Sequence, residues 1–222
     1  MTMTMGPASA TLLDALAPRR TAAKSASHSL VIRAGWVVFL AALTAAAAQI
    51  SVPLPFTQVP FTFQPMIVLL GALALGPRLA VAAQLLYLAA GATGLPVFAA
   101  SVTLPPGALR LLGPTGGYLL SYPLAALVTG YLGQRILERR GFDRRYVTSV
   151  LAMAAGLAIV YLSGAAWLGL FAHTPDGSAA IGFTNAFLTG VVPFIAADVA
   201  KLLIAAGIVP GIWTLVGRPD PR

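Results

Sequence analysis

The chain has 222 residues, of which 58% are hydrophobic and only 9% are charged, and it contains no cysteine. Soluble domains carry about 25% charged residues, so a water-soluble fold is excluded, and a disordered chain is excluded because disorder requires low hydrophobicity. The lack of cysteine removes disulfides and thiolate metal sites, which leaves an integral membrane protein of one domain.

Long apolar stretches divide the sequence, and each can hold at least one membrane crossing of about 20 residues. Among them, residues 34–77, 79–109, 111–134 and 146–175 contain no Lys, Arg, Asp or Glu. The net charge of +8 therefore comes from basic residues between apolar segments rather than from a basic patch. This distribution is typical of the positive-inside rule and does not favour nucleic-acid binding.

In chain order, these stretches and their interruptions predict six membrane-spanning helices. The segment SVPLPFTQVPFTFQP (51–65) is broken by prolines and predicts a loop. Residues 180–190 are expected to form a short interfacial helix, and Pro193 is expected to begin the last span because proline favours the first helical turn. The expected spans cover residues 31–50, 62–76, 79–97, 116–136, 146–171 and 193–214.

The basic residues predict the orientation of this all-α polytopic bundle. With both termini in the cytoplasm, twelve of the 14 Lys and Arg residues lie on the cytoplasmic side, Arg110 lies outside and Lys201 lies within a span. An odd or shifted number of spans spoils this separation. We therefore expect a membrane domain over residues 31–216, flanked by a basic cytoplasmic tail (1–30) and a short cytoplasmic tail (217–222).

The N-terminal region has an alternative interpretation. Arg19 and Arg20, followed by an apolar run that ends in AAAAQ, also fit a cleaved signal peptide. Cleavage would leave five spans.

Asp198 and Lys201 are the only charged pair inside an expected span. A charge at the bilayer centre costs roughly 2.5–3.5 kcal/mol on insertion scales, and the i, i+3 spacing puts both side chains on one helix face, which must then look into the bundle. Counted from Pro193, the pair lies one to two turns in from the outer surface. It is either a self-neutralising structural contact or part of a polar-ligand site reached from outside, where Asp accepts N–H donors and Lys donates to a carbonyl or carboxylate.

Two other positions near the outer surface carry polar groups. Gln64 lies in the FTFQP segment (61–65) at the outer end of the second expected span, where it either interacts with nearby backbone or reaches a ligand. GPTGGY (113–118) opens the fourth expected span, and its glycines allow close approach of a ligand or of a neighbouring helix. Tyr118 adds a ring and a hydroxyl. No Gly-Lys-Ser/Thr follows, so the segment is not a phosphate loop.

Small residues in the first expected span recur at four-residue spacing. Ala41 is paired in this way with Ala45, and Ala42 with Ala46. This spacing makes a flat helix face, which serves either internal packing or the docking of another membrane subunit.

Four sequence motifs occur in a characteristic order: SVPLPFTQVPFTFQ, GATGLPVF, LLGPTGGYLLSYPLAA and GVVPFIAADVAKLL. Together they resemble the BioY family over about residues 36–212. That family comprises the substrate-binding membrane components, or S components, of energy-coupling-factor biotin transporters. The resemblance implies a six-helix bundle that binds biotin from the outside.

The resemblance also assigns roles to single residues. Asp198 and Lys201 match the family's Asp-x-x-Lys at the ligand head, Gln64 matches the glutamine after the first loop, and Tyr118 matches the aromatic residue that closes GPTGGY. Asp198 is able to accept from the ureido N–H groups of biotin, while Lys201 donates either to the ureido oxygen or to Asp198 itself. Residues 99–110 depart from the family's glycine-rich loop, so no ligand contact is carried over there. The alanine face resembles the surface that S components present to the transmembrane coupling subunit.

The expected function is therefore biotin uptake by a transport subunit embedded in membrane lipid. The chain has no Walker A motif, so separate ATPase and transmembrane coupling subunits are expected to supply energy. Biotin is the transported ligand, no cofactor is expected, and a homo-oligomer is left open. His28 and His173 are isolated, which gives no metal site. The alternatives are a small intramembrane enzyme that uses Asp198 with Lys201, or a stand-alone facilitator for another small polar ligand.

Overall fold

The computed structural model describes residues 26–101, 104–137, 142–171 and 180–216, which are mostly helical. A small antiparallel hairpin pairs Ser51 with Thr62 and Val52 with Phe61. The elements are α2 (Ala26–Gln49), β1 (Ser51–Val52), β2 (Phe61–Thr62), α3 (Gln64–Leu75), α4 (Pro77–Ala92), α5 (Leu109–Leu112), α6 (Gly116–Leu137), α7 (Phe142–Phe171), α8 (Gly182–Gly190) and α9 (Val192–Val216).

The helices follow the predicted segments closely. Each of the six expected spans corresponds to one helix, and residues 180–190 largely form α8. Within the described ranges, three helices are long and apolar enough to cross a membrane on their own, namely Leu30–Gln49, Asp143–Phe171 and Val192–Ile212. Residues 26–30, assigned above to the N-terminal tail, belong to α2. The rest of that tail, with Arg19 and Arg20, and the tail at 217–222 lie outside the described residues.

Two boundaries differ from the predicted ones for clear physical reasons. The third expected span reached residue 97, but α4 ends at Ala92 and the chain turns through Gly94, whose φ of 100° is unfavourable for other residues. The fifth span was expected from residue 146, but α7 begins at Phe142 with Asp143 in its first turn. A carboxylate there stabilises the helix N-terminus, so the helix extends beyond the apolar stretch.

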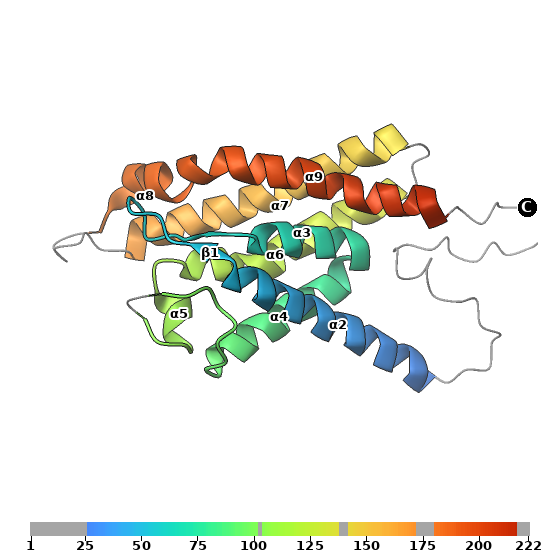
Figure 1. Ribbon diagram of the computed structural model, residues 1–222, viewed down its shortest axis with the longest axis horizontal. Helices are drawn as coiled ribbons and strands as arrows, with labels where there is room; N and C mark the ends of the chain where they lie inside the picture. Colours follow the sequence, from blue (N-terminus) through green and yellow to red (C-terminus); the bar gives the residue numbers. More distant parts are fainter. Residues whose placement is uncertain (1–25, 102–103, 138–141, 172–179, 217–222) are drawn as a thin grey trace, which may run out of the picture.

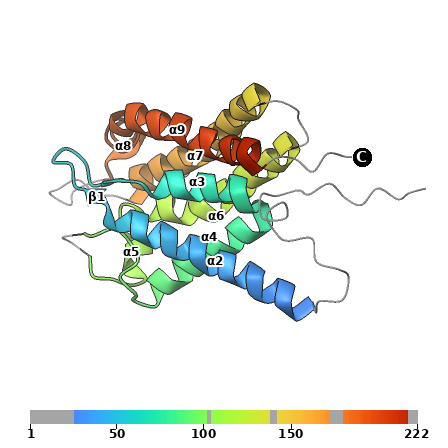
Figure 2. The same cartoon turned by 45° about the vertical axis from the view of Figure 1, so that its right-hand side comes forward.

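The bundle is organised around α6, which packs against α3, α4 and α7. Helices α7 and α9 lie together on one side, and α2 and α4 lie together on the other (Figures 1 and 2). The hairpin, α5 and α8 gather at one end of the bundle, whereas α2 begins and α9 ends at the opposite end. This arrangement leaves the irregular segments at one end to surround a site.

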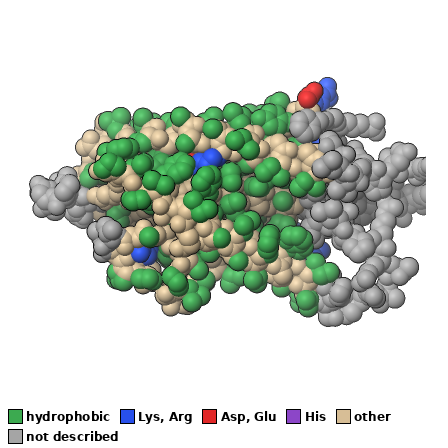
Figure 3. Space-filling model, viewed as in Figure 1, with side chains coloured by type: hydrophobic (Ala, Val, Ile, Leu, Met, Phe, Trp, Pro, Cys, Tyr) green, Lys and Arg blue, Asp and Glu red, His purple; other side chains and the backbone are tan. Residues whose placement is uncertain are grey.

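The outer surface of the bundle is apolar. Hydrophobic side chains cover most of the face shown in Figure 3, and few charged side chains interrupt them. Leu162 of α7 and Ile204 of α9 are 72% and 73% exposed. A surface of this kind is typical of a protein surrounded by lipid.

A tight turn joins α3 to α4 and packs against α6. Gly76 makes this turn with a φ of 78°, and Pro77 starts α4 at a position where its missing N–H leaves no helical hydrogen bond unmade. Gly130 of α6 lies directly against this turn, where a Cβ atom would collide with the backbone of Pro77. The GPR sequence at this turn thus fixes where α3 and α4 meet α6.

Candidate ligand-binding site

A cavity of about 510 Å³ lies at the end of the bundle where the hairpin and α8 gather. This volume falls within the range of roughly 300–1,000 Å³ that is usual for small-molecule sites. Apolar residues make up most of the lining, and eleven residues with polar side chains complete it. These are Gln64, Arg110, Tyr118, Tyr122, Tyr161 and Asp198, with Thr62 of β2 and Thr57, Gln58, Ser101 and Thr115 from the surrounding loops and turns.

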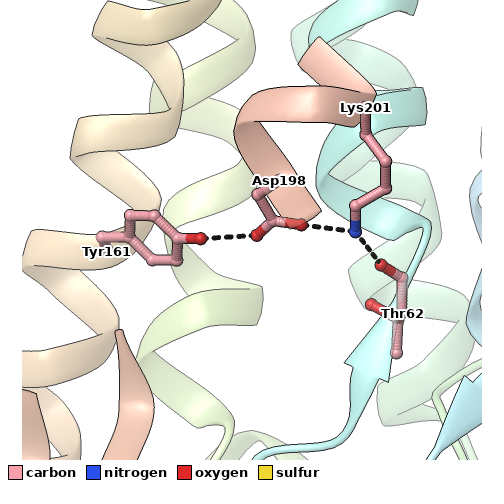
Figure 4. Close-up of polar contacts among 4 residues, drawn as sticks. All are labelled: Thr62, Tyr161, Asp198 and Lys201. Atoms are coloured by element: carbon pink, nitrogen blue, oxygen red, sulfur yellow. Dashed lines mark hydrogen bonds and ion pairs between the residues drawn. The ribbon is translucent and has the colours of Figure 1, made fainter. Parts of the chain in front are cut away.

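Asp198 is buried in α9 and is one of the residues that line this cavity. Its Oδ2 atom accepts a 2.6 Å hydrogen bond from the hydroxyl of Tyr161 on α7, and its Oδ1 atom pairs with the ammonium of Lys201 one turn along α9. Figure 4 shows this chain of contacts. Hydrogen bonding and ion pairing together hold the carboxylate in one orientation at the cavity wall.

Lys201 forms contacts with the protein and is not among the residues that line this cavity. Its Nζ donates a 2.8 Å hydrogen bond to the carbonyl oxygen of Thr62 in β2, and it lies 4.0 Å from the ring centroid of Phe61 and 5.1 Å from that of Phe63. A backbone carbonyl that is shielded from water and lies outside a helix needs such a partner, because an unpaired buried carbonyl is costly. Lys201 therefore joins Asp198 to the hairpin.

Gln64 lines the same cavity from the start of α3 and is only 3% exposed. Its Nε2 donates a 2.5 Å hydrogen bond to the hydroxyl of Tyr87 on α4. The side chain thus contacts a neighbouring helix, rather than the local backbone that is one of the two alternatives given by the sequence.

Tyr118 lines the cavity from the first turn of α6. Its hydroxyl donates a 2.8 Å hydrogen bond to the carbonyl oxygen of Gly190, which ends α8. Gly117 next to it packs against Trp167, and a Cβ atom at Gly164 would collide with the Tyr118 ring. Of the two roles open for the glycines of GPTGGY, the structure supports close helix packing.

Arg110 of α5 completes the polar lining from the 99–110 loop. Its Nη1 donates to the carbonyl oxygen of Ala99 at 2.8 Å, and its Nε donates to that of Pro105 at 3.0 Å. Partial burial lowers the pKa of the guanidinium from its ordinary value, yet an arginine remains protonated in proteins. The cavity rim therefore carries a fixed positive charge.

The four alanines of α2 do not share one environment. Ala41 is buried and Ala45 is half-buried against the core, while Ala42 and Ala46 are exposed. The helix thus divides the small residues between an inner face that packs against the bundle and an outer face that no other described residue covers.

Sequence reasoning missed Tyr161 and Tyr122, and it assigned Arg110 no role beyond its place outside the membrane. Tyr161 lies in an uncharged span, and nothing in its local sequence points to Asp198, from which it is separated by 37 residues. In the described part of the chain no cluster of His, Asp and Glu able to hold a metal ion occurs. His173, considered above for a metal site, lies outside the described residues.

Comparison with known proteins gives consistent matches. The model of the BioY family matches residues 20–218. A protein of Pyrococcus horikoshii called "Probable biotin transporter BioY" is 39% identical over 169 residues, which cover 76% of this chain and 88% of that protein. "Biotin transporter BioY" of Thermotoga maritima is 36% identical over 176 residues, which cover 79% of this chain and 90% of that protein.

A solved structure has the same fold. The crystal structure of the S-component for biotin from an ECF-type ABC transporter superposes with a TM-score of 0.69 and covers 86% of this chain and 95% of its own. Its sequence is 22% identical, so this likeness concerns the arrangement of the helices.

Proposed function

Because this chain belongs to the BioY family, we propose that it is the biotin-binding membrane subunit of an uptake system. It is a multi-pass protein of the plasma membrane and a transport subunit rather than an enzyme, like the relatives named as biotin transporters. Biotin is its transported ligand and not a cofactor.

The observation that carries this proposal is the cavity with the Asp198 carboxylate in its wall. A buried carboxylate held by Tyr161 and Lys201 is a strong, oriented acceptor for N–H groups. The ureido ring of biotin has two such donors. Asp198 is the residue we assign to them, and the apolar lining suits the fused rings and the aliphatic part of the tail.

Gln64 and Tyr118 are assigned to the same ligand site. Both line the cavity, and both have a polar group already bonded to the protein, Gln64 to Tyr87 and Tyr118 to Gly190. Gln64 is therefore held in place to offer its amide oxygen, and Tyr118 offers the face of its ring. Lys201 was expected to donate either to the ureido oxygen of biotin or to Asp198. We assign it to Asp198, because its ammonium contacts Asp198 and the Thr62 carbonyl.

We infer that α2, α3, α4, α6, α7 and α9 cross the membrane and that both termini are cytoplasmic. The start of α2 and the end of α9 lie at the same end of the bundle, and the α3–α4 turn with Arg78 lies there too. Helix α5, which contains Arg110, lies at the opposite end with the hairpin and α8 (Figure 1). The positive-inside rule then puts the cavity end outside the cell.

Energy for concentrative uptake would come from separate ATPase and transmembrane coupling subunits. The exposed alanines of α2, Ala42 and Ala46, are the surface that we assign to the coupling subunit, whereas Ala41 and Ala45 pack toward the core and support that helix from within. Small exposed residues allow a partner helix to approach closely, which is the usual way that helices associate in lipid.

The direct test is equilibrium binding of labelled biotin to the purified full chain in lipid nanodiscs, measured beside the Asp198→Asn variant. Saturable binding by the natural chain, weakened in the variant, is expected. A well-folded natural chain that does not bind biotin would contradict the proposal. Saturable binding that Asp198→Asn leaves unchanged would retain the function and remove Asp198 from the site.

A further inference from the structure

Arg110 is a charged residue in the cavity lining that the assignment above leaves without a task. Among the residues that form this lining, Arg110 has the only positively charged side chain and Asp198 has the only negatively charged one. Asp198 already has Lys201 as its counter-ion. Across the described ranges, Arg110 forms no ion pair with a carboxylate, so its charge faces the cavity uncompensated.

The hydrogen bonds of Arg110 fix the position of this charge. Nε and Nη1 each donate to a backbone carbonyl, those of Pro105 and Ala99, at the two sides of the 99–110 loop. A guanidinium has five N–H donors in a rigid plane. The two bonds use the Nε donor and one Nη1 donor of the guanidinium. Within the described part of the chain, the remaining N–H donors are left for a group in the cavity.

We propose that Arg110 binds the carboxylate of the ligand and so selects ligands with an anionic tail. This inference rests on the proposed function, because biotin carries its carboxylate at the opposite end from its ureido ring. Asp198 and Arg110 would then recognise the two ends of one molecule with opposite charges. The carboxylate would accept one or two charge-assisted hydrogen bonds from the guanidinium.

A purely structural role for Arg110 makes a different prediction. If the side chain only ties Ala99 to Pro105, its loss would loosen the loop and weaken every ligand to the same extent. If it binds the carboxylate, its loss would affect only ligands that carry this charge. The ratio of two affinities therefore separates the two roles, and a loss of folding cannot imitate the second.

The experiment compares biotin with biotinamide, which keeps the rings and the tail carbonyl but lacks the negative charge. Affinities are measured by isothermal titration for the natural chain and for Arg110→Gln, Arg110→Lys and Arg78→Gln. The natural chain should prefer biotin by about 10- to 100-fold. Arg110→Gln should bind both ligands about equally, with its biotinamide affinity within about twofold of the natural value.

The two remaining variants are controls. Arg110→Lys keeps the positive charge without the planar, paired N–H donors of a guanidinium, and should keep part of the preference for biotin over biotinamide. Arg78→Gln removes an exposed charge at the other end of the bundle and should keep all of it.

Three results would overturn the inference while leaving biotin capture intact: no preference for biotin in the natural chain, a preference that survives in Arg110→Gln, or an equal loss for both ligands in that variant. Failure of the natural chain to bind either ligand would instead contradict the proposed function, and with it this inference.

Discussion

The hydroxyl of Tyr161 and the carboxylate of Asp198 are joined by a 2.6 Å hydrogen bond that connects α7 to α9. Both residues also line the cavity. Because Lys201 pairs with the other carboxylate oxygen, the ligand-facing orientation of Asp198 depends on two different helices. Tyr161 is thus a positioning residue for Asp198, and this role can be measured.

Tyr161→Phe is expected to weaken biotin binding by about tenfold, because it removes a hydrogen bond to a charged group, which is worth about 1.5–3 kcal/mol. The phenyl ring fills nearly the same volume, so the variant should still fold, with a melting temperature lowered by the loss of this hydrogen bond. Tyr131→Phe in α6, where the ring is half exposed, is the matched control and should bind normally. Equal affinity in both variants, measured by titration calorimetry, would show that Asp198 needs no support from Tyr161.

Asp198→Asn and Lys201→Met are each expected to weaken biotin binding by at least about 2 kcal/mol, since each leaves a buried charged partner uncompensated. The double variant removes both charges and should regain much of the thermal stability that the single variants lose. Its biotin binding should stay weak, because the acceptor for the ureido N–H groups is still missing. Recovery of both stability and binding in the double variant would make the pair a purely structural contact.

The double substitution Ala42→Leu and Ala46→Leu is expected to leave biotin binding unchanged, since both positions are exposed. It should impair assembly with a coupling subunit, because the larger side chains prevent close approach of a partner helix. The control is Ala41→Leu, one position away but buried against the core, which should lower the melting temperature instead. Assembly is measured by co-purification with the coupling and ATPase subunits. Normal co-purification of the Ala42/Ala46 variant would move the partner surface elsewhere.

Much of this architecture could be predicted because a bilayer imposes strong rules on sequence. The uncharged stretches predicted the helices, and the break predicted before Pro193 is the boundary between α8 and α9. The hairpin of β1 and β2 could not be predicted, because strands of two residues are too short to show an alternating pattern of apolar and polar residues. The same holds for α5, whose four residues are too few to show helical periodicity.

Candidate site residues could be named from the sequence where charge is rare within a span and where a motif marks a position, as for Gln64 and Tyr118. Asp198 and Lys201 stand out within an apolar span, but the contacts of Lys201 with Thr62 and Phe61 depend on how the hairpin folds against α9. The rings of Phe61 and Phe63 flank this ammonium. Tyr161 and Arg110 gain their roles from partners 37 and 11 residues away, a relationship that no local spacing encodes.

Gly164→Ala is expected to lower the stability of the bundle by about 1–3 kcal/mol, the usual cost of overpacking a well-filled interior. A methyl group there would meet the Tyr118 ring, which is held between α7 and the end of α8 by its bond to Gly190. Relief of the clash requires α6 and α7 to separate at the cavity wall, so biotin affinity should fall as well.

Gly35→Ala in α2 is the control, because no atom lies within 4 Å of the new methyl group and alanine favours a helix over glycine. Melting temperature in detergent and biotin titration of both variants provide the measurements. A Gly164→Ala chain as stable and as tight-binding as Gly35→Ala would mean that the Tyr118 ring is free to move aside and is not held as part of the binding wall.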